Sequence, residues 1–281
     1  MSFIVFTSGK SYDNIEVYGG FMRLKLVKIV GITAGILLII GLVVLASVTS
    51  GKGKPISEDL GETVELEEGV EGVTLTNYSG KNIKITRAGV YAFFEDFDKS
   101  IIVEADGDVT LIFNKVTIQN EKTAAIINNT EHKLTIALTE EEVSKFYGGS
   151  NRKYKGVIYS EGEVEFMGDQ GGLVIMGRLA DTEPIYTDKK ITVRDGTIVM
   201  LSKKEFPTEK ITTTQNKIHF AVKNEVKKDS SVAVLDNLGD SIMNFVAEVN
   251  FSHLTMTSAS LTPAKHFLYI DDTLVMSEMG E

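Results

Sequence analysis

Three tyrosines and two nearby basic residues are the side chains of this 281-residue sequence best suited to hold a ligand. Tyr159 and Tyr186 each follow an isoleucine in similar triplets, and Tyr154 precedes the first of these triplets. An outward row of tyrosine rings would form a platform for sugar rings, and Lys190 and Arg194 would lie close enough to contact a sugar carboxylate. The alternatives are a cross-strand aromatic pair that only stabilises a sheet, and a solvated basic rim.

Three carboxylates near these tyrosines are candidate calcium ligands, namely Glu161, Glu163 and Asp188. Calcium takes six to eight oxygen ligands, from carboxylates and carbonyls that converge on the ion. Glu161 and Glu163 alternate with Glu165, so the spacing predicts that all three point to one face of a strand. Asp188 stands at the equivalent turn one repeat later. The alternative is a solvated acidic face without a metal.

Residues for catalysis are poorly supported by the sequence. The four histidines stand far apart in the sequence, without evident Ser/Asp partners or metal-ligand spacing: His132, His219, His253 and His266. A polysaccharide lyase would need a base such as Arg178 or Arg194, and a hydrolase would need a carboxylate pair at a defined separation. No glycine-rich phosphate motif is found, which argues against a nucleotide ligand. The sequence therefore favours a non-catalytic protein, with a lyase or hydrolase as an alternative.

A repeat between Ile126 and Phe220 must position these side chains. Its unit is a short β-like triplet, a polar turn and a second triplet, and the leading isoleucines stand at 126, 158, 185 and 211. The second triplets begin at positions 134, 164, 191 and 218. A period in the range of 20 to 50 residues that is built from short strands predicts a solenoid or a β-helix. Asn128, at one of the turns, is expected to be structural.

The chain from Gly72 onward has the composition of an all-β protein. Parallel strands in other folds need long, usually helical crossovers, whereas the connections here are a few polar residues. We therefore expect an all-β fold, a single-stranded parallel β-helix over residues 72–227. The segment from Val109 to Ile118 is expected to be two strands that meet at a bend, and Thr139–Phe146 has a possible helical turn. Residues 228–278 are interpreted as a small β cap over the last coil.

An uncharged apolar stretch from Ile29 to Val48 precedes these strands. Its 20 residues would span about 30 Å as a helix, which matches the hydrocarbon thickness of a membrane. Basic residues before it put residues 1–28 in the cytoplasm, with 49–71 as a linker and the rest outside the cell. The alternative is a cleaved signal peptide and secretion. Met22 begins a more typical N-terminus than Met1, and we expect translation to begin there.

The charge of the chain is uneven. The formal net charge is −10, and residues 1–54 hold six basic and two acidic residues, or +4, which leaves −14 for the remainder. A strongly acidic domain argues against nucleic acid, which requires basic patches. It is compatible with divalent cations or neutral glycans. The absence of cysteine excludes a disulfide scaffold and a thiolate metal site.

Several phrases of the sequence resemble one family, the bacterial surface carbohydrate-binding proteins with a pectate-lyase-like parallel β-helix. The likeness covers roughly residues 60–276 and rests on these phrases: Gly89-Val90-Tyr91-Ala92-Phe93, Val109 to Ile118, Ala124-Ala125-Ile126-Ile127, Ile158-Tyr159-Ser160, Leu261-Thr262-Pro263 and Phe267-Leu268-Tyr269. The resemblance implies a right-handed helix, an extracellular location, a polysaccharide ligand and bound calcium.

The sequence departs from this family where calcium would bind. The family tends to place two aspartates just before each second triplet. Here those positions hold Gly162-Glu163, Lys189-Lys190 and Asn216-Lys217, and lysine cannot ligate calcium. A structural or adhesion scaffold that has lost both sugar and calcium binding is therefore the main alternative to a carbohydrate-binding protein.

Overall fold

The computed structural model describes residues 63–66, 80–139, 143–149, 151, 153–168 and 171–280. All of these residues belong to one compact unit within Gly51–Glu281. Regular structure in the described residues consists of β-strands and one 3-10 turn, η2 (Thr208–Lys210). The prediction of an all-β fold is thus confirmed. The predicted anchor 29–48 lies outside the described residues, and within them no helix is long and apolar enough to cross a membrane.

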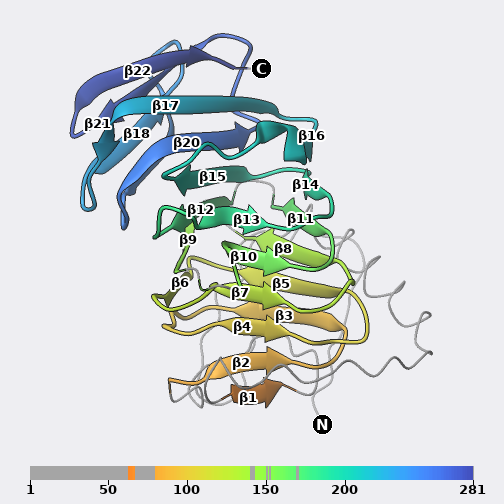
Figure 1. Cartoon of the computed structure of the whole chain (residues 1–281). Coiled ribbons are helices and arrows are strands. Elements are labelled where there is room, and N and C mark those ends of the chain that lie inside the picture. Colours follow the sequence, from red (N-terminus) through yellow and green to blue (C-terminus); the bar gives the residue numbers. More distant parts are fainter. Residues whose placement is uncertain are drawn as a thin grey trace, which may run out of the picture. The chain divides into compact units, whose positions relative to one another are not determined.

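Three six-stranded sheets, A, B and C, contain most of the described strands (Figure 1). In spatial order, sheet A contains β1 (Thr63–Leu66), β2 (Asn82–Ile85), β4 (Ile101–Val103), β7 (Ile126–Asn128), β10 (Gly156–Ser160) and β13 (Glu183–Tyr186). Sheet B contains β3 (Gly89–Phe93), β5 (Val109–Phe113), β8 (Leu134–Leu138), β11 (Val164–Met167), β14 (Ile191–Val193) and β16 (Ile211–Thr213). Sheet C contains β6 (Thr117–Asn120), β9 (Val143–Gly148), β12 (Gly172–Gly177), β15 (Thr197–Ser202), β20 (Phe251–Ser258) and β17 (Asn216–Val226).

From β4 to β15 the chain visits sheets A, B and C in turn, and one such passage is called a coil below. Each strand pairs in parallel with the equivalent strand of the neighbouring coil, as Ile126 does with Ile158 and Ile158 with Ile185. The leading isoleucines of the first three repeats are therefore in register. The prediction of stacked parallel strands is confirmed, and the handedness of the coils stays a prediction.

Inward side chains of all three sheets form one apolar cluster along the coils. Phenylalanines continue it from coil to coil, since the rings of Phe93 and Phe113 stack with their centroids 5.3 Å apart. Polar side chains fill the corner between sheets A and B: the Asn128 amide donates to the Ser160 hydroxyl at 3.0 Å, and the Thr187 hydroxyl donates to the Gly162 carbonyl at 3.0 Å. This confirms the structural role expected for Asn128.

The third sheet is absent from the sequence pattern, which contains only two triplets per repeat. Sheet C strands β9, β12 and β15 fall between the second triplet of one repeat and the first of the next. The possible helical turn at 139–146 is wrong in its described part, because Val143 to Phe146 belong to β9. The two strands expected between Val109 and Ile118 are β5 and β6, and Lys115 makes the bend with a φ of 53°.

The fourth repeat is displaced by one sheet. Its spacing predicts that Ile211 pairs with the leading isoleucine of the third repeat, but Ile211 pairs with Ile191, which begins the second triplet of that repeat. The segment before β16 contains η2 and no sheet A strand, and the buried ring of Phe206 joins the inward cluster there. In the last coil, a loop that buries the Phe206 ring thus replaces the sheet A strand.

The C-terminal part is divided between two sheets. Sheet D is antiparallel and contains, in spatial order, β19 (Ser241–Val246), β18 (Ser231–Leu235), β21 (Lys265–Ile270) and β22 (Thr273–Met279). β20 instead enters sheet C between β15 and β17 and runs antiparallel to both. The outer side chains of sheet C, including Val174 and Val199, share a second apolar cluster with Phe245 and Leu268 of sheet D. The region 228–278, expected as a separate cap, therefore completes sheet C as well as covering it.

Candidate functional site

The outer face of sheet A carries the tyrosines singled out from the sequence. Register pairing aligns Ile102, Ile127, Tyr159 and Tyr186 across β4, β7, β10 and β13. Their neighbours on either side, such as Ile158 and Ile185, point into the inward cluster. Because side chains alternate along a strand, these four form one outward row, which we call the sheet A row.

The rings of the sheet A row pack on one another. Tyr159 and Tyr186 are parallel, with an angle of 5° between their planes and 5.8 Å between centroids. Tyr154 meets Tyr159 edge-on, at 77° and 4.9 Å. Both arrangements are favourable for aromatic pairs. Tyr159 and Tyr186 thus form a cross-strand aromatic pair whose rings face each other, with Tyr159 held between two neighbours, and their use as a platform for sugar stays a prediction. A ligand would meet mainly the ring edges and hydroxyl groups.

The segment before β10 covers the lower part of the sheet A row. Tyr154 is fully buried and packs with Ile102 and Ile127, which are 2% and 0% exposed although they point outward. The Asn151 side-chain oxygen fixes this segment by accepting the backbone N–H groups of Lys153 and Tyr154, at 2.9 and 2.8 Å. Accessible surface on the row is therefore concentrated at Tyr159 and Tyr186, which are both half-buried.

Charged side chains surround the exposed end of the row. The ammonium group of Lys155 lies 5.4 Å from the centroid of the Tyr186 ring, and that of Lys153 lies 5.0 Å from the Tyr154 ring. The Tyr159 hydroxyl donates to the Glu161 carboxylate at 3.4 Å. Burial, reinforced by the negative charge of Glu161, raises the pKa of Tyr159 to about 12. Tyr159 therefore stays protonated, and its oxygen can still accept a hydrogen bond.

Lys190 and Arg194 are divided from the tyrosines by the corner of the coil. Lys190 is exposed in the turn between β13 and β14, where its carbonyl accepts the N–H of Val164. Arg194 follows β14 in sheet B, and its Nε lies 2.5 Å from the carboxylate of Glu165 on the neighbouring β11. Lys133 binds the other oxygen of that carboxylate at 3.1 Å. Arg194 is thus engaged with Glu165, on a different face from Tyr159.

The three candidate calcium ligands do not form a metal centre. Among the residues that the structure describes, no group of three or more acidic, histidine or cysteine side chains is placed to hold a metal ion. Glu161 and Glu163 lie in the turn that follows β10, and Glu165 lies on β11 in another sheet, so the prediction that they share one strand face is wrong. Asp188 is exposed in the next turn. The described side chains therefore offer no cluster of carboxylates for calcium, and calcium binding stays a prediction.

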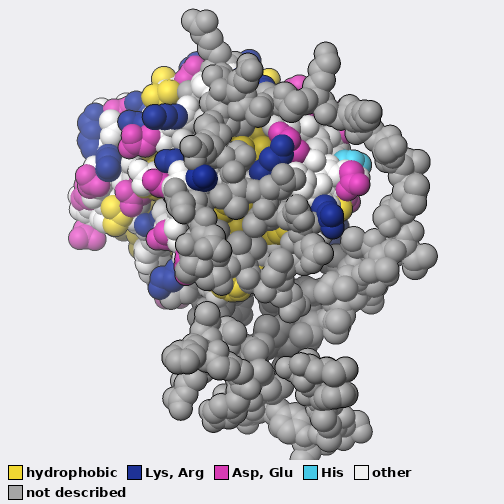
Figure 2. Space-filling model, turned by 90° about the horizontal axis from the view of Figure 1, so that it is seen from below, with side chains coloured by type: hydrophobic (Ala, Val, Ile, Leu, Met, Phe, Trp, Pro, Cys, Tyr) yellow, Lys and Arg dark blue, Asp and Glu magenta, His cyan; other side chains and the backbone are white. Residues whose placement is uncertain are grey.

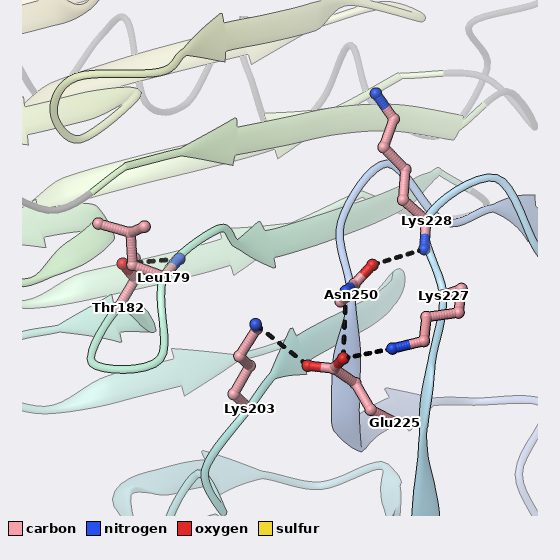
Figure 3. A network of polar contacts seen from close by, with 7 residues as sticks. All are labelled: Leu179, Thr182, Lys203, Glu225, Lys227, Lys228 and Asn250. Carbon is pink, nitrogen blue, oxygen red and sulfur yellow. Dashed lines mark hydrogen bonds and ion pairs between the residues drawn. The ribbon is translucent and has the colours of Figure 1, made fainter.

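Other basic side chains are also held by carboxylates. Arg178, the other arginine considered as a lyase base, forms an ion pair with Glu121 at 3.5 Å. In Figure 3, Glu225 lies between Lys203 and Lys227, at 3.1 and 2.9 Å. Hydrogen bonds from Lys227 and then Lys203 lower the pKa of Glu225 to about 2. Seen from below, the described surface also intersperses acidic and basic side chains (Figure 2).

Sequence reasoning singles out Tyr154, Tyr159, Tyr186 and Glu161, which the structure brings together. It does not single out Lys155, which lies beside them. The signal is present in the local pattern Lys153-Tyr154-Lys155, which places a cation on each side of an aromatic residue. Gly156 explains how Lys155 reaches Tyr186, because a Cβ there would stand 2.7 Å from the Tyr186 nitrogen. Only glycine permits that close approach of β10 to β13.

Comparison with known proteins agrees with a ligand role for these coils. No curated protein and no solved structure matches the sequence. Residues 79–207 match the model of a family described as "Carbohydrate-binding domain-containing protein", a segment that begins just before β2 and ends just after β15. This match supports a carbohydrate-binding role for the stacked coils.

Proposed function

We propose that the chain is a non-catalytic polysaccharide-binding protein that holds its ligand on the outer face of sheet A. The family match over the coils supports a carbohydrate as the ligand. The aligned pair Tyr159 and Tyr186 is the observation that favours the outer face of sheet A as its site. The proposal includes a single parallel β-helix, supported by the order in which the chain visits sheets A, B and C, and the right hand that the family resemblance implies. It also includes the N-terminal anchor at 29–48 and an extracellular position for the coils.

The ligand is expected to run along the stack of coils. Paired strands lie about 4.8 Å apart, so equivalent side chains recur at that interval. A sugar chain lying along this direction would meet Tyr159 and Tyr186 in succession. The Tyr159 oxygen can accept a hydrogen bond from a sugar hydroxyl, and the Glu161 carboxylate has further acceptor capacity beside it. Lys155, near the Tyr186 ring, can donate to a ring or hydroxyl oxygen.

Binding without chemistry is favoured by the pairing of the two arginines that a lyase mechanism would use. Arg178 is paired with Glu121, and Arg194 with Glu165. A guanidinium held by a carboxylate is a poor proton acceptor, because the ion pair stabilises its charged form. We therefore expect no product release from polygalacturonate.

Glycan-array binding with the full chain tests the proposal. We expect a positive glycan signal that survives a chelator, since the described carboxylates do not form a calcium site. Tyr186→Ala should weaken binding about two- to tenfold, the range of one aromatic contact. Phe94→Ala is the matched control, because Phe94 is 53% exposed just after β3 in another sheet and should leave binding unchanged.

Failure of the array would point to the other hypothesis. A scaffold without a sugar site predicts that no glycan binds, with or without calcium. A glycan signal that Tyr186→Ala leaves intact would retain carbohydrate binding but remove the sheet A row as its site. Loss of glycan binding when a chelator is added would show that binding requires calcium, held by ligands other than a cluster of described carboxylates.

A further inference from the structure

A groove at the C-terminal end of the fold is separate from the sheet A row. It has a volume of about 620 Å³, within the range of small-ligand sites. One wall is β9, and the other comes from strands β18, β19 and β21 of sheet D with the turn after β21: Val143, Lys145, Ser231, Val232, Ala233, Asn244, Phe245, Val246, Tyr269 and Asp272. Most of these residues lie beyond residue 207, where the family match ends.

The groove combines an apolar lining with polar groups that have unused capacity. Val143, Ala233 and Val246 are accessible aliphatic residues of the lining, and Val246 is 44% exposed. Within the described part of the chain, the side chains of Asn244, Tyr269 and Asp272 make no hydrogen bond or ion pair. An amide, a phenol and a carboxylate together offer both donors and acceptors.

The position of Asp272 is fixed by its neighbour. Asp271 and Asp272 have φ angles of 47° and 60°, the backbone of a two-residue hairpin turn between β21 and β22. The Asp271 carboxylate accepts the Ser231 N–H at 2.8 Å and the Ser230 hydroxyl at 3.0 Å, which fastens the turn to β18. The turn therefore holds Asp272 at the groove before any ligand arrives, and this reduces the entropy lost on binding.

The lining chemistry selects a neutral ligand that is partly apolar. Lys145 and Asp272 contribute one charge of each sign, so the groove gives no net attraction to a polyanion, and Lys145 is already 3.8 Å from Glu248. A sugar bearing only hydroxyl groups would leave some of them unpaired against the aliphatic side chains, which is costly. An acetamido group instead offers a methyl for the aliphatic wall and an amide for Asn244.

We infer that this groove is a second binding site, for a short neutral saccharide that carries acyl groups, such as N-acetylated hexosamine units. The saccharide class rests on the proposed carbohydrate-binding function, but the site shares no residue with the sheet A row. The two sites can therefore be lost separately. A long acylated polysaccharide could then occupy both the groove and the sheet A row, whereas a short one would occupy one site at a time.

Calorimetry on the full chain with three trisaccharides tests the inference. The probes are tri-N-acetylchitotriose, cellotriose and trigalacturonic acid. We expect the acetylated probe to bind more tightly than the other two, and Asn244→Ala to weaken it about fivefold, the effect of one hydrogen bond. Asp272→Asn should weaken it by a similar factor and keep the turn, because asparagine tolerates positive φ.

Control variants separate this site from the row and from misfolding. Asn237→Ala changes an exposed residue in the turn between β18 and β19, outside the groove lining, and should leave binding unchanged. The same titrations are repeated in a Tyr186→Ala background, where the aromatic contact of the sheet A row is removed. Asn244→Ala should weaken the acetylated probe by the same factor there, so the outcome does not depend on whether the row binds sugar. The inference is overturned if the acetylated probe binds no better than cellotriose, or if Asn244→Ala has the same affinity as the parent chain.

Discussion

Two buried tyrosines should respond in opposite directions to loss of the same atom. Tyr154 and Tyr91 are both fully buried. The Tyr91 hydroxyl donates to the Arg87 carbonyl at 2.9 Å, whereas the Tyr154 hydroxyl is buried without a hydrogen-bond partner among the described residues. A phenylalanine at either position keeps the ring and its packing. The difference between the two variants therefore isolates the hydrogen bond.

The magnitudes follow from the state of each hydroxyl. A buried polar group without a partner costs about 1–3 kcal/mol, so Tyr154→Phe should raise the free energy of unfolding by up to that amount. Tyr91→Phe removes a hydrogen bond and should lower it by about 0.5–1.5 kcal/mol. For a domain of this size, 1 kcal/mol corresponds to about 2–4 °C in Tm. The two variants should thus melt on either side of the parent chain.

Thermal and urea unfolding of both variants would measure this difference. The edge-on contact of Tyr154 with Tyr159 is retained in phenylalanine, so packing should not mask the effect. The reasoning is refuted if Tyr154→Phe lowers stability as much as Tyr91→Phe does. That result would mean that the Tyr154 hydroxyl finds a partner in solution, and that the cover over Ile102 and Ile127 is held by a polar contact.

Three further predictions concern charge and packing. Burial would raise the pKa of Glu165, but hydrogen bonds from Arg194 and a lysine outweigh burial and lower that pKa. The ionised carboxylate therefore stabilises the fold above the unfolded pKa near 4.5. This stabilisation is lost as pH falls through the folded pKa. Glu165→Gln should cost about 1–2 kcal/mol at pH 7 and flatten the acid limb of a Tm–pH curve. Burial, and then the charge of His253, lower the pKa of His219. The contribution of neutral His219 to stability is therefore full above the unfolded pKa of 6.5 and declines as pH falls below it. His219→Gln should reduce the loss of Tm between pH 7 and 5. Phe206→Ala should cost about 3–5 kcal/mol in urea unfolding, because the ring is 1% exposed in the inward cluster, and a neutral outcome would show that another side chain fills the space.

The stacked strands could be predicted from sequence because they repeat. The leading isoleucines at 126, 158 and 185 occupy one inward position in three successive coils, and a buried ladder requires the same residue type at each. The same alternation places Tyr159 and Tyr186 outward. Short-range pattern is sufficient for both features.

Features that depend on contacts between distant segments could not be predicted in this way. Arg194 and Tyr186 are close in sequence, which suggests one site, but the turn between them moves Arg194 to another sheet, beside Glu165. The displaced fourth repeat has the same cause. The spacing of Ile211 matches that of the leading isoleucines, but in the structure Ile211 pairs with Ile191 of sheet B. The groove at Asn244 joins strands about 100 residues apart in sequence, and no local pattern marks such a meeting.

The entry of β20 into sheet C has a consequence for the order of folding. Strands β9, β12 and β15 can each form a ladder with the strand of the preceding coil, so they can add one after another as the chain emerges. β17 has no such neighbour, because its one partner among the described strands of sheet C is β20, which begins 25 residues after β17 ends. Its backbone groups stay unpaired until residue 258 is available, and loop closure delays that pairing. A chain released before that point would carry two open strand edges, at β15 and β17, and so would be prone to associate with its own copies.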